Sequence, residues 1–223
     1  MPANPPPPPR IVPAGELTEL IATVIAILTL PSPAPGRLDA LAVPIGQGEE
    51  WRLRHAIRVW ESDPEIRFLL VANGNPAERT YVAMTPGYLR QLGLRRLDGV
   101  CVQPEPAPNT ALQAGWITEQ AWALGVRSLA VAVSPYHLPR AFLTVLRAMT
   151  GRGIRIPLFP APVPVPPHVT VPETGATAHE LVPGEMQRIL RYADAGWVST
   201  ADEVRVYLAW LWAQPGLLDP RPE

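Results

Sequence analysis

The chain contains no lysine, because all 19 of its basic residues are arginine. A P-loop, a Schiff-base enzyme and a pyridoxal-phosphate site each depend on a lysine amine, so these classes are excluded. Any anion that the protein binds must therefore be held by arginine, histidine or backbone N–H groups.

Cysteine occurs only once, as Cys101. A single thiol can form neither an intramolecular disulfide nor a cysteine-based zinc cluster. His55, His168 and His179 show no metal-ligand spacing with one another, so we expect no metal site. The scarcity of cysteine fits a reducing compartment, and the sequence predicts a cytoplasmic protein. Association with the cell envelope is the alternative.

Charge is also scarce, at 17% of residues against 47% hydrophobic residues, and the net charge is −1. No basic surface of the kind that binds nucleic acid is indicated, so we expect no nucleic-acid partner. The length of 223 residues suits one α/β domain with small additions.

A long hydrophobic run is absent. The most apolar segment, Leu17–Leu30, has 14 residues and includes Glu19 and three threonines. A bilayer span needs about 20 apolar residues, so we expect a buried helix, and a membrane partner is disfavoured. A signal peptide and a membrane anchor are the alternatives. The preceding proline run is typical of a disordered or polyproline II tail.

Short apolar stretches bounded by turn residues alternate with segments of helical spacing from Arg37 onward. This alternation predicts a Rossmann-like α/β/α fold with a parallel sheet of about five strands. We divide the chain into a tail and helix (1–36), this Rossmann-like domain (37–165) and a proline-rich loop with C-terminal helices (166–223). The expected strands are 38–46, 67–74, 99–104, 128–134 and 154–162, and the expected helices between them are 50–62, 77–93, 109–125 and 136–149.

The C-terminal helices are expected at Glu185–Ala195 and Ala201–Ala213. Thr200 and Glu203 have the spacing of a capping box before the second helix. Trp210 and Trp212 cannot both face its buried stripe, so one of the two is expected to be exposed. The exposed tryptophan is a candidate for a homo-oligomer contact, with simple edge packing as the alternative.

Ligands of parallel α/β folds bind beyond the carboxyl ends of the strands, so we expect the binding residues at these ends. Polar or glycine residues follow four of the strands. We take His137 and Ser134 as candidate catalytic residues, with His137 as a general acid or base. The candidate ligand-binding residues are Gly46, Gly48, Arg54, Asn73, Gly74, Glu105, Asn109, Thr110, Tyr136 and Arg140.

Structural roles for these residues stay open. Asn109 is a good N-cap, Arg54 could be a solvated helix charge, and His137 could be a buried histidine bonded to its neighbours. The turn with Gly46 and Gly48 lacks the rest of a G-x-G-x-x-G pattern, so it is weak evidence for a dinucleotide.

Four short segments resemble the YdcF-like family, a domain of unknown function that includes the SanA and ElyC proteins. They are "GQG…RLRHA", "VANG", "EPAPNT" and "SPYHLPRA", within residues 38–162. The resemblance implies a Rossmann-like domain with a polar pocket at the strand ends and a role often linked to the bacterial envelope. Many relatives look membrane-anchored, and the short segment Leu17–Leu30 departs from that.

The sequence favours binding of a phosphorylated or nucleotide-like anionic small molecule, with Arg140 and Arg54 holding the anion. Hydrolysis and group transfer are the reactions that such a site would suit. The alternatives are a non-catalytic binder of a nucleotide or S-adenosylmethionine, and an envelope-related accessory protein. No cofactor other than S-adenosylmethionine is suggested.

Overall fold

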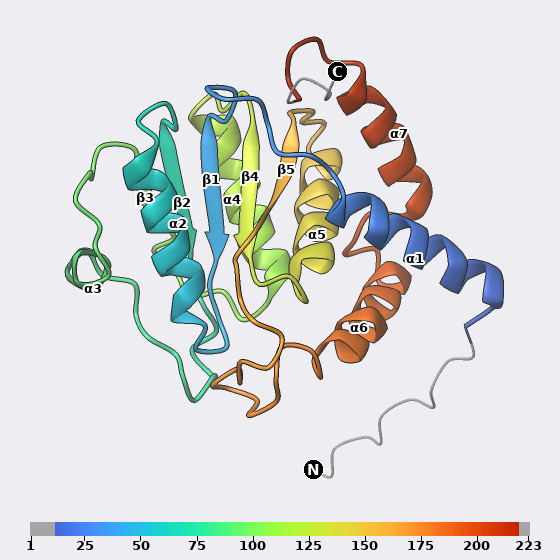
Figure 1. Ribbon diagram of the computed structural model, residues 1–223, viewed down its shortest axis with the longest axis horizontal. Helices are drawn as coiled ribbons and strands as arrows, with labels where there is room; N and C mark the ends of the chain where they lie inside the picture. Colours follow the sequence, from blue (N-terminus) through green and yellow to red (C-terminus); the bar gives the residue numbers. More distant parts are fainter. Residues whose placement is uncertain (1–11, 219–223) are drawn as a thin grey trace.

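Five strands form one parallel sheet in the order β3-β2-β1-β4-β5 (Figure 1). The computed structural model describes residues 12–218, so the proline-rich tail lies outside the described residues. The parallel sheet and its alternating helices confirm the predicted Rossmann-like fold. The strands are β1 (Ala40–Pro44), β2 (Phe68–Ala72), β3 (Val100–Val102), β4 (Leu129–Val133) and β5 (Leu158–Pro162).

The central strands are buried on both faces, which explains their continuous apolar sequences. All five residues of β1 and of β4 are buried, as expected where helices cover both sides of a parallel sheet. Helix α2 (Glu50–Ser62) lies on one face, and α4 (Thr110–Ala123) and α5 (Leu138–Gly151) lie on the other (Figure 1). The loops after the strands consequently gather at a single edge of the sheet.

The predicted helix over residues 77–93 is much shorter in the structure. Only α3 (Pro86–Gln91) is helical, and residues 77–85 form a loop. Pro86 explains the late start, because proline disfavours the helical conformation in the residue before it and suits the first helical turn. Thr85 is accordingly extended and caps the helix by accepting a hydrogen bond from the Tyr88 N–H at 3.1 Å. The loop over residues 77–85 thereby remains free to border the carboxyl edge of the sheet.

The N-terminal and C-terminal helices pack beside α5. Helix α1 (Ala14–Leu28) contacts α5 and α7 (Ala201–Trp212), and α6 (Val182–Asp194) contacts α5. Buried side chains from all three helices join the same hydrophobic core as the sheet. The three helices and the Rossmann-like part of the chain therefore share one hydrophobic core.

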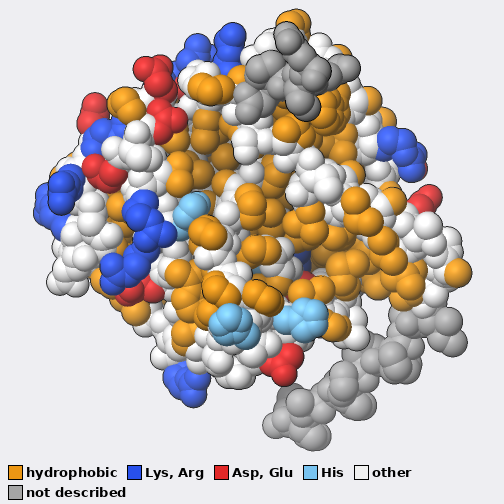
Figure 2. Space-filling view, viewed as in Figure 1, with side chains coloured by type: hydrophobic (Ala, Val, Ile, Leu, Met, Phe, Trp, Pro, Cys, Tyr) orange, Lys and Arg blue, Asp and Glu red, His pale blue; other side chains and the backbone are white. Residues whose placement is uncertain are grey.

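Helix α1 buries one face and exposes another. Leu20 and Ile27 are buried, whereas its opposite side carries exposed aliphatic side chains, and Figure 2 shows hydrophobic side chains over the region where α1 lies. The exposed residues are Leu17, Ile21, Ile25 and Leu28. Within residues 12–218, the structure holds no helix of sufficient length and hydrophobicity to span a membrane.

Helix α7 begins with the predicted capping box. The Thr200 side chain accepts from the Glu203 N–H at 3.2 Å, and the Glu203 carboxylate accepts from the Thr200 N–H at 2.8 Å. Of the two neighbouring tryptophans, Trp210 packs against the core and Trp212 is exposed, as the spacing required.

Candidate functional site

A small polar pocket lies at the carboxyl edge of the sheet, with a volume of about 50 Å³. Its wall combines the turn after β1, the N-terminus of α4 and the N-terminus of α5. Four of the polar side chains on its wall were predicted from sequence, two at the start of α4 and two at the start of α5. Its polar side chains are Gln47, Arg52, Asn75, Glu78, Asn109, Thr110, Gln113, His137 and Arg140.

A buried carboxylate from a distant helix organises one side of this pocket. Glu185, in the first turn of α6, accepts from Nε of Arg140 at 2.5 Å and from Nη2 of Arg140 at 3.1 Å. Two parallel N–H···O bonds of this kind fix the plane of a guanidinium group. The remaining terminal nitrogen of Arg140 donates to Thr110 Oγ1 at 2.9 Å, and Arg188 adds a further bond to Glu185 at 2.6 Å.

His137 completes this cluster, because its Nδ1 lies 3.2 Å from Oε2 of Glu185. Burial, followed by the nearby positive charge of Arg140, lowers the pKa of His137 to about 3. Burial alone would raise the pKa of Glu185, but the hydrogen bonds from His137 and Arg140, together with the charge of Arg140, hold this pKa well below its usual range. His137 is therefore neutral near pH 7, and Nδ1 donates to the ionised Glu185. Its Nε2 is then the ring nitrogen that can accept a proton.

A second buried network lies behind the polar pocket. Glu49 and Arg52 form an ion pair at the start of α2, and both are at least 96% buried at the side chain. Ser134, which follows β4, donates to Glu49 at 2.7 Å and accepts from Arg52 Nε at 3.3 Å and from Trp51 Nε1 at 3.1 Å. These bonds tie the start of α2 to the end of β4.

Tyr136 extends this second network to the turn after β1. Its hydroxyl lies 3.0 Å from Oε1 of Gln47 and 3.1 Å from Oε2 of Glu49, and Arg52 Nη2 donates to it at 3.3 Å. Burial raises the pKa of the Tyr136 hydroxyl. The hydroxyl is therefore a neutral bridging group.

The turn after β1 adopts left-handed backbone conformations at two successive residues. Gln47 has φ 57° although it is not glycine, and Gly48 has φ 70°. A Cβ at Gly48 would lie 2.8 Å from Thr80 Cβ and 2.9 Å from Pro172 Cβ, so only glycine fits. The Gln47 N–H donates to Glu78 Oε2 at 2.6 Å, and this bond holds the loop over residues 77–85 against the turn. Strain of this kind is typical of functional sites.

The N-terminus of α4 forms another wall. Asn109 is its N-cap and accepts from the Leu112 N–H at 3.0 Å. The structural role that the sequence left open for Asn109 is therefore present. The first N–H groups of such a helix carry partial positive charge and favour anions. Gln113, one turn later, donates to the carbonyl oxygens of Ile45 at 2.7 Å and Asn73 at 2.8 Å, which joins the ends of β1 and β2.

The residues selected from sequence divide into three groups. Gly46, Asn109, Thr110, His137 and Arg140 line the polar pocket, and Gly46, Gly48 and Gly74 line a neighbouring cleft. Ser134, Tyr136 and Asn73 are buried and line neither cavity. Arg54 and Glu105 are exposed and also lie outside both linings.

Two of these placements change the interpretation of the sequence. Ser134 is 0% exposed and makes three hydrogen bonds within the protein, so the geometry assigns it to supporting Glu49 and Arg52 and not to attacking a ligand. Arg54 pairs with Glu50 at 2.6 Å on the exposed side of α2, and Arg52, two residues earlier, takes the place beside the pocket that Arg54 was expected to have.

Sequence reasoning missed four of the charged residues in and around the pocket, in addition to Gln47, Asn75 and Gln113 on its wall. Helical periodicity could have found Arg52 and Glu49, because they share the buried side of α2 with Leu53 and Ala56. Glu78 and Glu185 lie in a loop and in a C-terminal helix, and no local pattern marks either of them.

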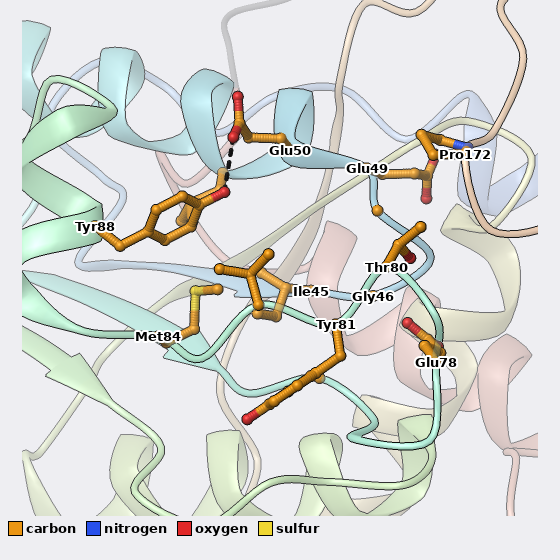
Figure 3. Close-up of a pocket in the computed structure, with 14 residues that line it drawn as sticks. Ile45, Gly46, Glu49, Glu50, Glu78, Thr80, Tyr81, Met84, Tyr88 and Pro172 are labelled. Carbon is orange, nitrogen blue, oxygen red and sulfur yellow. Dashed lines mark hydrogen bonds between the residues drawn. The ribbon is translucent and has the colours of Figure 1, made fainter.

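The neighbouring cleft has a volume of about 180 Å³ and is largely apolar (Figure 3). Figure 3 shows Ile45, Met84, Tyr81 and Tyr88 around it, with the Tyr88 hydroxyl bonded to Glu50 at 2.7 Å. Glu78 lines both this cleft and the polar pocket. The two cavities are therefore adjacent and share part of one wall.

Together, the fold and these cavities define a parallel α/β protein with a charged pocket at the carboxyl edge of its sheet. Among residues 12–218, no group of three or more His, Cys, Asp or Glu side chains is arranged to hold a metal ion. No protein-family model matches the chain, and no curated protein matches it.

Proposed function

We propose that this chain is a YdcF-like protein that binds a phosphorylated or nucleotide-like small molecule in the polar pocket. The observation that carries the proposal is the position of His137 and Arg140. Both line the pocket at the start of α5, and Glu185 holds both by hydrogen bonds. A buried guanidinium beside a neutral histidine suits an anionic group such as phosphate.

The charges around the pocket support an anionic ligand. The pocket wall itself carries two guanidinium groups, Arg52 and Arg140, and one carboxyl group, Glu78. Burial raises the pKa of Glu78. A raised pKa favours the neutral form of Glu78 when an anion enters, because two like charges would repel each other.

The same geometry supports a hydrolase or a transferase. With Nδ1 bound to Glu185, His137 has the arrangement of a general base that is held in one tautomer by a carboxylate. Its low pKa makes it a weak base by itself, and a bound anion raises that pKa because negative charge favours the protonated ring. In a hydrolytic step, Nε2 would take a proton from water as the water oxygen bonds to phosphorus and the P–O bond to the organic group breaks. The departing oxygen then receives this proton from Nε2, while Arg140 stabilises charge on the phosphoryl oxygens. No side-chain nucleophile is needed for this step.

A second candidate function is binding without turnover. Ser134 is fully buried and is bonded within the protein, and this favours a non-catalytic binder of a nucleotide or S-adenosylmethionine. A cytoplasmic location, which the scarcity of cysteine favours, and a homo-oligomer contact through the C-terminal tryptophans remain part of the proposal. An accessory role at the envelope rests on the family resemblance.

Thermal unfolding and turnover test the proposal. Inorganic phosphate, adenosine monophosphate and S-adenosylmethionine would each be added to wild type and to Arg140→Gln. A ligand present at 100 times its dissociation constant stabilises the folded state by about 2.7 kcal/mol. We expect phosphate and adenosine monophosphate to stabilise wild type but not the variant. Absence of stabilisation by every anion would refute the proposal.

Hydrolysis of p-nitrophenyl phosphate then separates the two functions. Turnover that falls about a hundredfold or more in His137→Gln supports the enzyme. Stabilisation by anions without turnover supports the non-catalytic binder.

A further inference from the structure

The apolar cleft continues directly from the polar pocket. Ile45, Gly46 and Glu78 line both cavities, so a ligand in one cavity borders the other. Glu78 comes from the loop after β2, and Ile45 and Gly46 follow β1. The junction between the cavities therefore lies at the carboxyl ends of two neighbouring strands, where ligands of parallel α/β folds bind.

The cleft and the pocket differ in chemistry. Apolar side chains, including Ile45, Leu53, Val82 and Met84, supply much of the cleft wall, and the rings of Tyr81 and Tyr88 border it (Figure 3). Its charged lining residues are all carboxylates, whereas Arg52 and Arg140 line only the pocket. The carboxylates that line the cleft are Glu49, Glu50 and Glu78.

The cleft is also held in shape by bonds within the protein. Glu173 accepts from Thr80 Oγ1 at 2.7 Å and from the Thr80 N–H at 2.9 Å, which fixes the loop over residues 77–85 to the proline-rich segment. Pro172 packs near Gly48 on the same side, and Tyr88 is bonded to Glu50. A wall held in this way does not have to be ordered by the ligand, which favours binding.

From these features we propose that the ligand is a phosphate monoester that spans both cavities, an inference that rests on the proposed function. The phosphoryl group lies in the polar pocket beside His137 and Arg140. An uncharged aromatic group lies in the apolar cleft, against Met84 and Tyr88. The reverse orientation is disfavoured, because a phosphoryl group in the cleft would face carboxylates and no guanidinium.

The ester oxygen then lies near Glu78, at the junction. Burial raises the pKa of this carboxyl group, with the negative charge of Glu173 adding to the effect and the Gln47 N–H and Arg52 opposing it. The Gln47 N–H donates to Oε2 of Glu78 at 2.6 Å and holds this carboxyl group at the junction. The apolar cleft thereby recognises the aromatic group of the ester, and the polar pocket recognises its phosphoryl group.

Calorimetric titration with three probes tests this inference: inorganic phosphate, phenyl phosphate and 4-carboxyphenyl phosphate. Burial of a phenyl group predicts that phenyl phosphate binds at least tenfold more tightly than inorganic phosphate. We expect 4-carboxyphenyl phosphate to lose this advantage, because its carboxylate would face the carboxylates of the cleft. A general hydrophobic contact elsewhere would not discriminate against the added carboxylate in this way.

Two matched variants locate the effect. Val82→Glu places a further carboxylate at an exposed position of the cleft, and Leu97→Glu makes the same change at an exposed position outside it. We expect the tenfold preference for phenyl phosphate to disappear in Val82→Glu and to persist in Leu97→Glu. A preference that survives in Val82→Glu, or phenyl phosphate that binds no more tightly than phosphate to wild type, overturns the inference and leaves the proposed function standing. Failure of inorganic phosphate and both esters to bind overturns both.

Discussion

The imidazole of His137 and the carboxylate of Glu185 lie 3.2 Å apart although 48 residues separate them in the sequence. His137 ends the turn that follows β4, and Glu185 lies in the first turn of α6. Their contact brings a C-terminal helix to the edge of the sheet. The candidate general base is therefore held by a residue outside the segment that resembles the YdcF-like family.

The burial of His137 next to Arg140 predicts loss of stability in acid. In the unfolded chain His137 titrates near its ordinary pKa of 6.5, whereas in the folded protein its pKa is lowered to about 3. The unfolded state therefore binds more protons as the pH falls below 6.5, so the free energy of unfolding decreases between pH 6.5 and 3. The lowered pKa of Glu185 acts in the same direction, but only below its ordinary value of 4.5.

His137→Gln isolates the contribution of the histidine. The stability of wild type relative to this variant should fall as the pH is lowered from 7 to 5, a range in which Glu185 does not titrate. Urea unfolding at a series of pH values measures this difference. A difference that does not change with pH would contradict a neutral, buried His137.

Arg140 and Arg54 should differ strongly when each is replaced by alanine. Arg140→Ala leaves the buried Glu185 without its two-bond partner and should cost about 3 kcal/mol or more of unfolding free energy. Arg54→Ala removes only an exposed pair with Glu50 and should cost less than about 1 kcal/mol. Chemical denaturation of both variants gives the comparison. Similar losses would argue against the buried pair that the structure shows.

Ser134→Ala tests whether this side chain is a nucleophile or a structural group. The variant removes a buried donor to Glu49 and should lower the unfolding free energy by about 1 to 3 kcal/mol. If the protein turns over p-nitrophenyl phosphate, a supporting role predicts that the variant keeps measurable turnover at a temperature where it is folded. Complete loss of turnover in a folded variant would restore Ser134 as the nucleophile.

Gly48→Ala and Gly153→Ala form a matched pair at positive φ. Both glycines are left-handed, with φ of 70° and 67°, but a Cβ at Gly153 meets no atom within 4 Å. Gly153→Ala should cost only the conformational penalty, about 1 kcal/mol. Gly48→Ala must also displace Thr80 or Pro172 and should cost about 1 to 3 kcal/mol more. Equal melting temperatures for the two variants would contradict this prediction, because they would show that Thr80 and Pro172 move aside at little energetic cost.

Much of the architecture follows from the sequence. Apolar stretches such as Leu129–Val133 alternate with segments of helical spacing, and this alternation is compatible with few folds other than a parallel sheet covered on both faces. The carboxyl ends of parallel strands share one edge, so the sequence also predicted that Gly46, Thr110, His137 and Arg140 would come together.

Helix α3 is shorter than the sequence predicted, and Pro86 is the reason. The segment over residues 77–93 has helical spacing, but the restriction that Pro86 places on the preceding residue leaves residues 77–85 as a loop. That loop carries Glu78, which lies at the junction of the two cavities. The local rule was visible in the sequence, but the contact of the loop with Gln47 was not.

Only the tertiary structure decided which charged groups surround the pocket. Whether Arg52 or Arg54 lies beside the pocket depends on which side of α2 packs against the sheet. The spacing of apolar residues along α2 indicates that side in part. The pairing of Glu185 with His137 and Arg140 has no such local trace. Spacing along a helix or strand sets the face on which a side chain lies, because the backbone geometry is regular. Which faces meet depends on burial of the whole core, and that packing joins residues that are far apart in the chain.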